Sequence, residues 1–388
     1  MRTDPLFPGF FIGGFECSTH RLACGRRLDM VAATGHDRLV EADYRRLLAH
    51  GIRTAREGIR WHLIEPTPGR FDFRSALMIL RAAREAGIQV IWDLLHYGWP
   101  DDLDIWGPEF VDRFARLARG FAGVLADEWP GVAWFAPVNE VSYLSWMGGQ
   151  VARINPFARG RGDELKDRLV RATIAATREI REVLPSARFA QVEPIFHVIP
   201  HPDRPEEAGA AESYRLAQYE VWDKLSGRLS PELGGSPEYL DVIGVNYYPW
   251  NQWIFEGEEA EGTGIGPDHP GYRPFREMLL EHFGRYGRPL FVAETGTEGD
   301  ARAGWLAHVG EEVRTAIRDG ADIHGLCLYP IVSFPGWDNG RDCRNGLWEQ
   351  PDEHGHRPIH EPLATELVRQ MRLLRPHAPH AQGAATGA

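Results

Sequence analysis

The segment that decides the fold is "AREAGIQVIWDLLH", residues 83–96. It joins the end of a helical pattern, a glycine at position 87 and an apolar run short enough to be a β-strand. A glycine that follows a helix adopts the left-handed conformation that ends it, and the chain then turns into the strand. The same succession returns in "RYGRPLFVAETG", residues 285–296, with Gly287. These segments predict helices that alternate with strands.

Eight strand-like runs recur along the chain, with helical patterns between them. They lie at residues 9–18, 52–61, 88–96, 132–140, 187–196, 240–248, 288–296 and 323–331. Eight such units predict a (β/α)8 TIM barrel in the α/β class. A doubly wound sheet is the alternative, but no Gly-rich phosphate loop follows the first run.

Long irregular segments follow the strands, whereas the connections from helix to strand are short. The long segments are residues 141–162, 197–211, 249–271 and 333–360. This asymmetry is typical of a barrel whose pocket lies at the C-terminal face of the strands. We therefore expect a single-domain barrel over residues 1–376 and a flexible C-terminal tail over residues 377–388.

Composition excludes some classes of function. The chain has 388 residues, of which 43% are apolar, and a formal net charge of −12. An acidic chain is a poor candidate for general binding to nucleic acids or anionic membranes. No run approaches 18 apolar residues, the N-terminus lacks a signal-peptide pattern, and the four cysteines form no CxxC pair. We expect a cytoplasmic protein without a membrane segment or a disulfide framework.

Two predicted strands end on a glutamate, Glu140 in "APVNEV" and Glu294 in "FVAETG". Strand ends meet at the pocket rim of a barrel, and glycoside hydrolysis needs two carboxyl groups there. One carboxyl donates a proton to the leaving oxygen, and the other attacks the anomeric carbon or activates water. A single glutamate at a strand end is more often solvated or caps a helix, but a pair favours catalysis.

Other carboxylates also lie in strand-like runs. They are Glu16, Glu57, Asp93 and Glu193. Glu57 follows Arg56, and alternation in a strand lets only one of the two face the barrel interior. We expect Glu57 to be a paired structural charge.

Six segments, in order, resemble family 1 glycoside hydrolases, the β-glucosidase type within the clan of retaining (β/α)8 glycosidases. They are "REGIRWHLIEPTPGRFDF", "LLHYGWPDDL", "APVNEV", "DVIGVNYYPW", "FVAETG" and "YPIVSFPGWDNG" followed by "NGLWE". The resemblance spans about residues 10–350. It implies that Glu140 is the general acid and then base, and that Glu294 is the nucleophile.

The resemblance also implies substrate-binding residues. Arg56 is expected to hold Glu294 ionised, and Asn139 to donate to the sugar 2-hydroxyl. Tyr248 matches the pocket tyrosine that bonds the nucleophile, and His96 matches the histidine that bonds the 3-hydroxyl. Trp337 is expected in the sugar platform. From the residues alone, core packing is the alternative interpretation of both His96 and Tyr248.

The chain departs from the family pattern at the sugar-binding positions. His20 stands where the family has glutamine, and Gly336 stands where it has a glutamate before the strand-8 tryptophan. Such a site is not expected to prefer ordinary glucose or galactose strongly. Arg341 and Arg344 follow in the same loop and offer an alternative, a phosphate or carboxylate on the sugar.

The predicted function is therefore retaining, exo-acting β-glycoside hydrolysis of a small-molecule substrate, without cofactor or metal. Its geometry predicts carboxyl groups about 5–5.5 Å apart. The alternatives are a metal-dependent (β/α)8 sugar isomerase or hydrolase and a catalytically inactive glycan-binding barrel. Transglycosylation uses the same intermediate and stays open.

Overall fold

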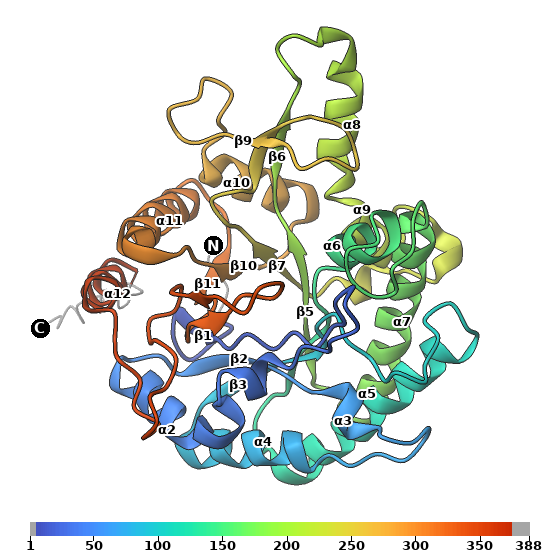
Figure 1. The fold of residues 1–388 in the computed structure, drawn as a ribbon, viewed down its shortest axis with the longest axis vertical. Helices are drawn as coiled ribbons and strands as arrows, with labels where there is room; N and C mark the ends of the chain where they lie inside the picture. The colour runs from blue at the N-terminus through green and yellow to red at the C-terminus, as the bar shows by residue number, and fades with distance from the viewer. Residues whose placement is uncertain (1–4, 375–388) are drawn as a thin grey trace, which may run out of the picture.

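The computed structural model describes residues 5–374 and contains a closed barrel of eight parallel strands (Figure 1). The strand order is β1-β11-β10-β7-β5-β4-β3-β2. The barrel strands are β1 (Phe11–Gly14), β2 (Thr54–Gly58), β3 (Gln89–Leu95), β4 (Trp134–Val138), β5 (Arg188–Pro194), β7 (Val242–Asn246), β10 (Leu290–Thr295) and β11 (Ile323–Leu328). Each lies inside one of the eight predicted runs, so the (β/α)8 prediction is confirmed.

A helix follows each barrel strand and covers the outside of the barrel (Figure 1). These helices are α2 (His36–Ala49), α4 (Arg74–Ala86), α5 (Glu109–Glu128), α7 (Gly162–Val183), α9 (Glu220–Leu225), α10 (Phe275–Tyr286), α11 (Arg302–Arg318) and α12 (Glu361–Leu373). Gly87 and Gly287 end α4 and α10 in the left-handed conformation, as the sequence predicts. Among the described residues, no helix is long and apolar enough to cross a membrane.

The other elements lie in the loops between these strands and helices. They are the helices α1 (Met30–Ala33), α3 (Trp61–Ile64), α6 (Val141–Leu144) and α8 (Ala208–Ala217), a π-helical turn at Ser145–Gln150, 3-10 turns at Pro205–Glu207, Pro231–Leu233, Pro237–Tyr239 and Gly299–Ala301, and the strands β6 (His197–Ile199), β8 (Gln252–Ile254), β9 (Thr263–Gly264), β12 (Phe334–Pro335) and β13 (Asp342–Cys343). Strands β6, β8 and β9 form a small sheet. With α8 it extends away from the barrel at the top of Figure 1.

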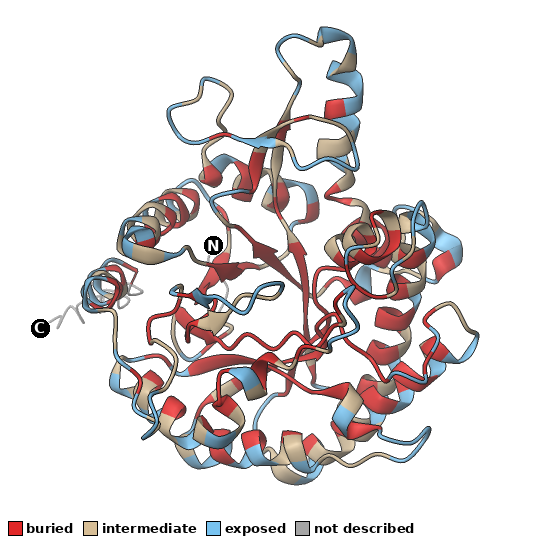
Figure 2. Cartoon of the chain, in the orientation of Figure 1, coloured by how far each residue is buried: buried red, intermediate tan, exposed pale blue. Residues whose placement is uncertain are grey.

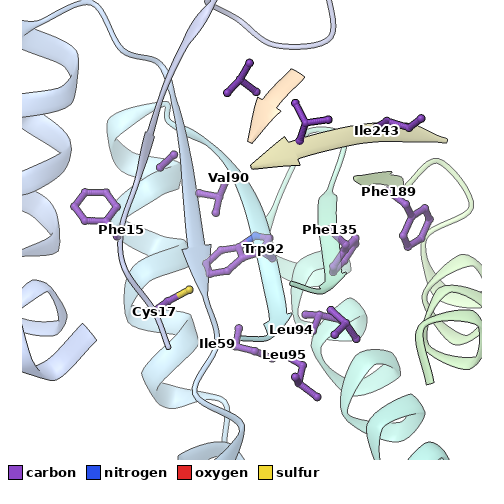
Figure 3. Close-up of a cluster of buried hydrophobic side chains, with 14 of the residues drawn as sticks. Phe15, Cys17, Ile59, Val90, Trp92, Leu94, Leu95, Phe135, Phe189 and Ile243 are labelled. Carbon is purple, nitrogen blue, oxygen red and sulfur yellow. The ribbon is translucent and has the colours of Figure 1, made fainter. Parts of the chain in front are cut away.

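Two apolar layers hold the barrel together. The outer layer lies between strands and helices; Figure 3 shows part of it, with Trp92 beside Val90 and with Phe135 and Phe189 on the following strands. The inner layer fills the barrel, where Phe7 packs against Trp134 with ring centroids 4.9 Å apart. Buried residues accordingly follow the strands and the inner faces of the helices (Figure 2).

The barrel domain predicted over residues 1–376 is described from residue 5 to residue 374. The tail expected at residues 377–388 lies outside the described residues. The segment expected to be irregular at residues 141–162 begins with α6 and the π-helical turn, because its apolar residues Val141 and Leu144 pack into the core.

Candidate active site

Glu294 lies near the end of β10, and both of its carboxylate oxygens have partners. Arg56 of β2 donates from Nη1 to Oε1 over 2.8 Å, and Tyr248 donates its hydroxyl to Oε2 over 2.7 Å. The glutamate is only 4% exposed. Arg56 and Tyr248 therefore both contact Glu294, the residue that the resemblance implies is the nucleophile.

The pKa of Glu294 is raised to about 7. Burial is the main cause, and the nearby charge of Glu140 adds to it. Arg56 and the hydrogen bond from Tyr248 act in the opposite direction. Arg56 therefore reaches Glu294 as expected and favours its ionised form, and burial acts against it.

Glu140 follows β4 and has different partners. Asn246 of β7 donates to Oε1 over 2.9 Å, and the hydroxyl of Tyr97 donates to Oε2. Asn246 also pairs in register with Glu294, which brings the two carboxyl groups to neighbouring positions on the rim. The two carboxyls interact electrostatically, so a proton retained near neutrality belongs to the pair. Arg56 donates to Glu294, whereas Glu140 accepts from Asn246 and Tyr97, so the two carboxyl groups have different partners.

The backbone of Glu140 is in the left-handed region, with φ +46°. This conformation is unfavourable for a residue with a Cβ. Glu193 of β5 holds the backbone that follows Glu140, because its carboxyl oxygens accept the N–H groups of Val141 over 2.6 Å and of Ser142 over 3.0 Å. Burial raises the pKa of Glu193 to about 8.

Asn139 is fully engaged with protein groups. Its Oδ1 accepts from Arg56 Nη2 over 2.6 Å, and its Nδ2 lies 3.0 Å from the Tyr97 hydroxyl and 3.2 Å from His96 Nε2. Donation to a sugar 2-hydroxyl, as the resemblance implies, therefore requires the amide to give up one of these partners.

His96 lies in a buried polar cluster with Asp93 and Cys17. Its Nδ1 is 3.0 Å from Asp93 Oδ2 and 3.2 Å from Cys17 Sγ. Because Arg56 fixes the orientation of the Asn139 amide, His96 Nε2 faces an N–H donor and has to accept, which requires a neutral ring. Burial lowers the pKa of His96 and its neighbours raise it, with a net upward direction. The main neighbour is Cys17 as a thiolate, yet burial raises the pKa of that thiol to about 12, so we assign the neutral imidazole.

Cys17, Asp93 and His96 all have side chains that can bind a metal ion, as the alternative metal-dependent function would require. However, Arg56 donates to both oxygens of Asp93, from Nε over 3.1 Å and from Nη2 over 2.8 Å. A cation bound to Asp93 would lie beside this guanidinium and be repelled by it. The arrangement fits a hydrogen-bonded cluster better than a metal centre.

Known proteins share the fold of this chain. No family model matches the chain. A family 1 β-glucosidase structure from Thermotoga maritima superposes with a TM-score of 0.74 at 17% identity, and it covers 95% of this chain and 99% of that one. The chain has the fold of a family 1 β-glucosidase. The same Thermotoga enzyme in complex with a calystegine derivative superposes with a TM-score of 0.76 at 17% identity, over 95% and 99% of the two chains.

Two curated proteins are also similar in sequence. β-Glucosidase 1B of Phanerodontia chrysosporium is 24% identical over 82% of this chain and 72% of its own length. A β-galactosidase of Sulfolobus acidocaldarius is 27% identical in an alignment of 175 residues that covers 38% of this chain. The match spans only 36% of that β-galactosidase. Both relatives agree with the β-glycosidase resemblance predicted from the sequence.

The chain differs from the β-glucosidase pattern around His20. This residue is fully buried, and its ring lies edge-on to Trp337 with centroids 4.5 Å apart. Burial lowers its pKa to about 3, so the ring is neutral. Neither ring nitrogen of His20 nor Nε1 of Trp337 has a hydrogen-bond partner within the described structure. Gly336, beside Trp337, supplies no side chain that reaches them.

A cavity of about 510 Å³ opens beside Trp337. Its lining includes Met147, Arg153, Arg159 and Glu259 but neither Glu140 nor Glu294. Trp337 lines this cavity, and its ring also lies edge-on to that of Tyr97, the donor to Glu140, with centroids 6.0 Å apart. Arg341, which the sequence offers with Arg344 as an alternative contact for a phosphate or carboxylate, donates to Glu298 over 2.6 Å.

Sequence reasoning missed three residues at the site: Tyr97, Asn246 and, as a stabilising group, Glu193. Tyr97 lies in the quoted "LLHYGWPDDL" segment, but its backbone has φ +68°, which breaks the alternation used to assign faces. Glu57 is indeed a paired structural charge, since it accepts from Tyr44 over 2.8 Å and lies 3.0 Å from His36 Nε2.

Proposed function

We propose that this chain is a retaining, exo-acting β-glycosidase that works through a covalent glycosyl-enzyme, without metal or cofactor. One observation carries the proposal: two buried carboxyl groups share the barrel rim and have unequal partners. Glu294 accepts from a guanidinium and a phenol, whereas Glu140 accepts from an amide and a phenol. Unequal environments are what a nucleophile and an acid require.

In the first step, a Glu294 oxygen attacks the anomeric carbon from the face opposite the leaving group. The bond from that carbon to the aglycone oxygen breaks, and the proton of Glu140 passes to the departing oxygen. The pKa of about 7 means that Glu294 is partly protonated near neutrality. We infer that deprotonation of Glu294 limits activity on the acidic side of the pH optimum.

In the second step, water attacks the anomeric carbon and gives its proton to Glu140, while Glu294 leaves as a carboxylate. The two inversions restore the β configuration. An alcohol in place of water gives transglycosylation by the same route.

The proposed substrate is a small-molecule β-glycoside. A structurally similar β-glucosidase from Thermotoga maritima has been solved in complex with glucoimidazole. In this chain the unpartnered nitrogens of His20 and Trp337 are the groups available to meet sugar hydroxyls beyond the reaction centre. A neutral imidazole and an indole N–H form fewer and weaker hydrogen bonds than a carboxylate would, which supports a non-standard or deoxy sugar.

The test is a panel of aryl β-glycosides, followed by a 2-deoxy-2-fluoro glycoside that traps the intermediate. Mass spectrometry of the trapped protein should find the label on Glu294, and NMR should find the β product first. Glu294→Gln should lower kcat/KM on the order of 10⁴-fold or more. Glu298→Gln is the matched control, since Glu298 is an exposed partner of Arg341.

The same experiment addresses the rivals. Loss of activity on treatment with chelators would favour the metal-dependent hydrolase. Glycoside binding without turnover, with Glu294→Gln binding equally well, would favour the inactive glycan-binding barrel. An inverted first product would refute the nucleophilic role of Glu294.

A further inference from the structure

Tyr97 occupies an unusual position between the two carboxyl networks. It follows β3 and His96, and it is 2% exposed. Its hydroxyl donates to Glu140 Oε2 and accepts from Asn139 Nδ2 over 3.0 Å. Burial raises the pKa of Tyr97 well above its ordinary value, and Glu140 and Glu294 add to this, so the phenol keeps its proton and donates it.

Residues from other segments of the chain hold the backbone around Tyr97 in place. Asn155 donates from Nδ2 to the Tyr97 carbonyl over 3.1 Å, and Thr19 N–H donates to the His96 carbonyl over 3.1 Å. At Gly98 a Cβ would lie 2.6 Å from the Thr19 carbonyl carbon, so the turn can approach this closely only with glycine. The left-handed conformation of Tyr97, at φ +68°, is therefore maintained by its surroundings.

A continuous path of hydrogen bonds passes through this hydroxyl. Glu140 accepts from Tyr97, which accepts from Asn139. Asn139 in turn accepts from Arg56 over 2.6 Å, and Arg56 donates to Glu294 over 2.8 Å. Three side chains thus join the acid to the nucleophile, with a donor facing the carboxylate at each end of the path.

We propose that Tyr97 is a positioning residue that orients Glu140 and favours its carboxylate form, so that Glu140 serves as the base in the second step. The proposal rests on the glycosidase function given above and adds to it a residue that acts through Glu140. Tyr97 acts by donating to one oxygen of Glu140, while Asn246 occupies the other.

The groups that face Glu140 determine how its protonation responds. Glu294 on β10 and Glu193 on β5 carry carboxyl groups near it. The phenols of Tyr97, Tyr143 and Tyr248 also feel its charge. Among these three, Tyr97 is the one with a hydrogen bond to Glu140 in the described structure, so its removal should affect Glu140 selectively.

The first test is Tyr97→Phe, which keeps the ring and removes the hydroxyl. A hydrogen bond to a charged group corresponds to about one to two pH units. The descending, alkaline limb of kcat/KM for a glycoside with a poor leaving group should therefore move upward by about one unit or more, because the carboxylate of Glu140 loses a donor. With an activated aryl glycoside, kcat should fall while kcat/KM changes less, because the base step slows.

Tyr143→Phe is the matched control. Its ring lies 5.6 Å from that of Tyr97, and its hydroxyl has no hydrogen bond to Glu140 in the described structure. The alkaline limb of Tyr143→Phe should superpose on that of the wild type. An alkaline limb of Tyr97→Phe that also superposes on the wild type would overturn the proposal.

A second variant covers the case in which Tyr97→Phe does not fold. 3-Fluorotyrosine introduced at position 97 keeps the ring and provides a stronger donor, so the alkaline limb should move to lower pH, opposite in sign to the phenylalanine variant. A limb that stays in place would again refute the role. A wild-type protein without β-glycosidase activity would instead refute the proposed function, so the two failures are distinguishable.

Discussion

Replacing Tyr248 with phenylalanine removes the hydroxyl that donates to Glu294 Oε2 over 2.7 Å. The ring should stay in place, because it stacks on Trp250 with centroids 5.1 Å apart and planes 4° apart. The variant therefore isolates one hydrogen bond to the proposed nucleophile. The variant tests how strongly the hydrogen bond from Tyr248 lowers the pKa of Glu294.

The magnitude follows from the pKa of about 7 for Glu294. A hydrogen bond to a charged group contributes about 1.5–3 kcal/mol, and 1.36 kcal/mol corresponds to about one pKa unit. Losing this bond destabilises the carboxylate, so the pKa of Glu294 should rise further, by about 1–2 units. With a rise of about 1.5 units, the ionised fraction at pH 6.5 falls roughly 25-fold.

The assay is the pH profile of kcat/KM with a dinitrophenyl β-glycoside, whose leaving group needs no proton from Glu140. The ascending, acidic limb should move to higher pH in Tyr248→Phe, and the loss of activity should shrink toward alkaline pH. Tyr247→Phe is the matched control, because that hydroxyl contacts Tyr272 and Gln252 instead of Glu294. A loss that is equal at every pH would refute the reasoning, since Tyr248 would then not influence the ionisation of Glu294.

Three further predictions concern stability. The folded pKa of Glu294, about 7, is above the unfolded value of about 4.5, so wild-type stability should fall by about 3 kcal/mol as pH rises between them. Glu294→Gln removes this dependence, and its melting temperature relative to wild type should rise between pH 5 and 7.5; a constant difference would contradict the pKa. For His36, burial lowers the pKa, but Glu57 and Asp43 raise it to about 9, above the ordinary 6.5. This raised pKa stabilises the folded protein by roughly 3 kcal/mol, fully present below pH 6.5 and lost as pH rises through 9. Denaturant titrations of His36→Gln should therefore show a destabilisation that is largest near pH 6. An equal destabilisation at pH 6 and pH 9.5 would exclude the charged histidine. Gly14→Ala places a Cβ against the Tyr329 ring and 2.9 Å from Cys327 Sγ, and should lower the free energy of unfolding by about 1–3 kcal/mol or more in denaturant titrations. The control Gly209→Ala in α8 places a Cβ that meets nothing within 4 Å, and should be neutral or stabilising. Equal effects of the two variants would show that the barrel interior at Gly14 is not tightly packed.

The barrel was predictable because its signals are local. A buried parallel strand requires a short apolar run, and the run 88–96 contains β3, Gln89–Leu95, with Gly87 ending the helix before it. The sheet formed by β6, β8 and β9 was not predicted. Its strands have two or three residues, and β6 pairs with β8 across more than 50 residues of sequence, as His197 with Gln252.

The site was predictable only where position along a strand decides it. Glu140 and Glu294 lie at strand ends, and the C-terminal ends of barrel strands meet at one rim. The partners of Arg341 were not predictable, since Glu298 lies on another loop. The engagement of the Asn139 amide also depends on contacts across three strands.

The two left-handed residues of the site, Tyr97 and Glu140, come from neighbouring strands and meet through one hydrogen bond. Each conformation costs about 1–2 kcal/mol relative to glycine-like freedom. Glycine would remove that cost at either position, so packing alone gives no reason for a tyrosine and a glutamate there. At both positions the left-handed conformation sets the direction of the side chain, so that the Tyr97 hydroxyl donates a hydrogen bond and Glu140 accepts it. The strain therefore lies where a rigid acid is needed, and it is offset by Asn155 beneath Tyr97 and by Glu193 beneath Glu140.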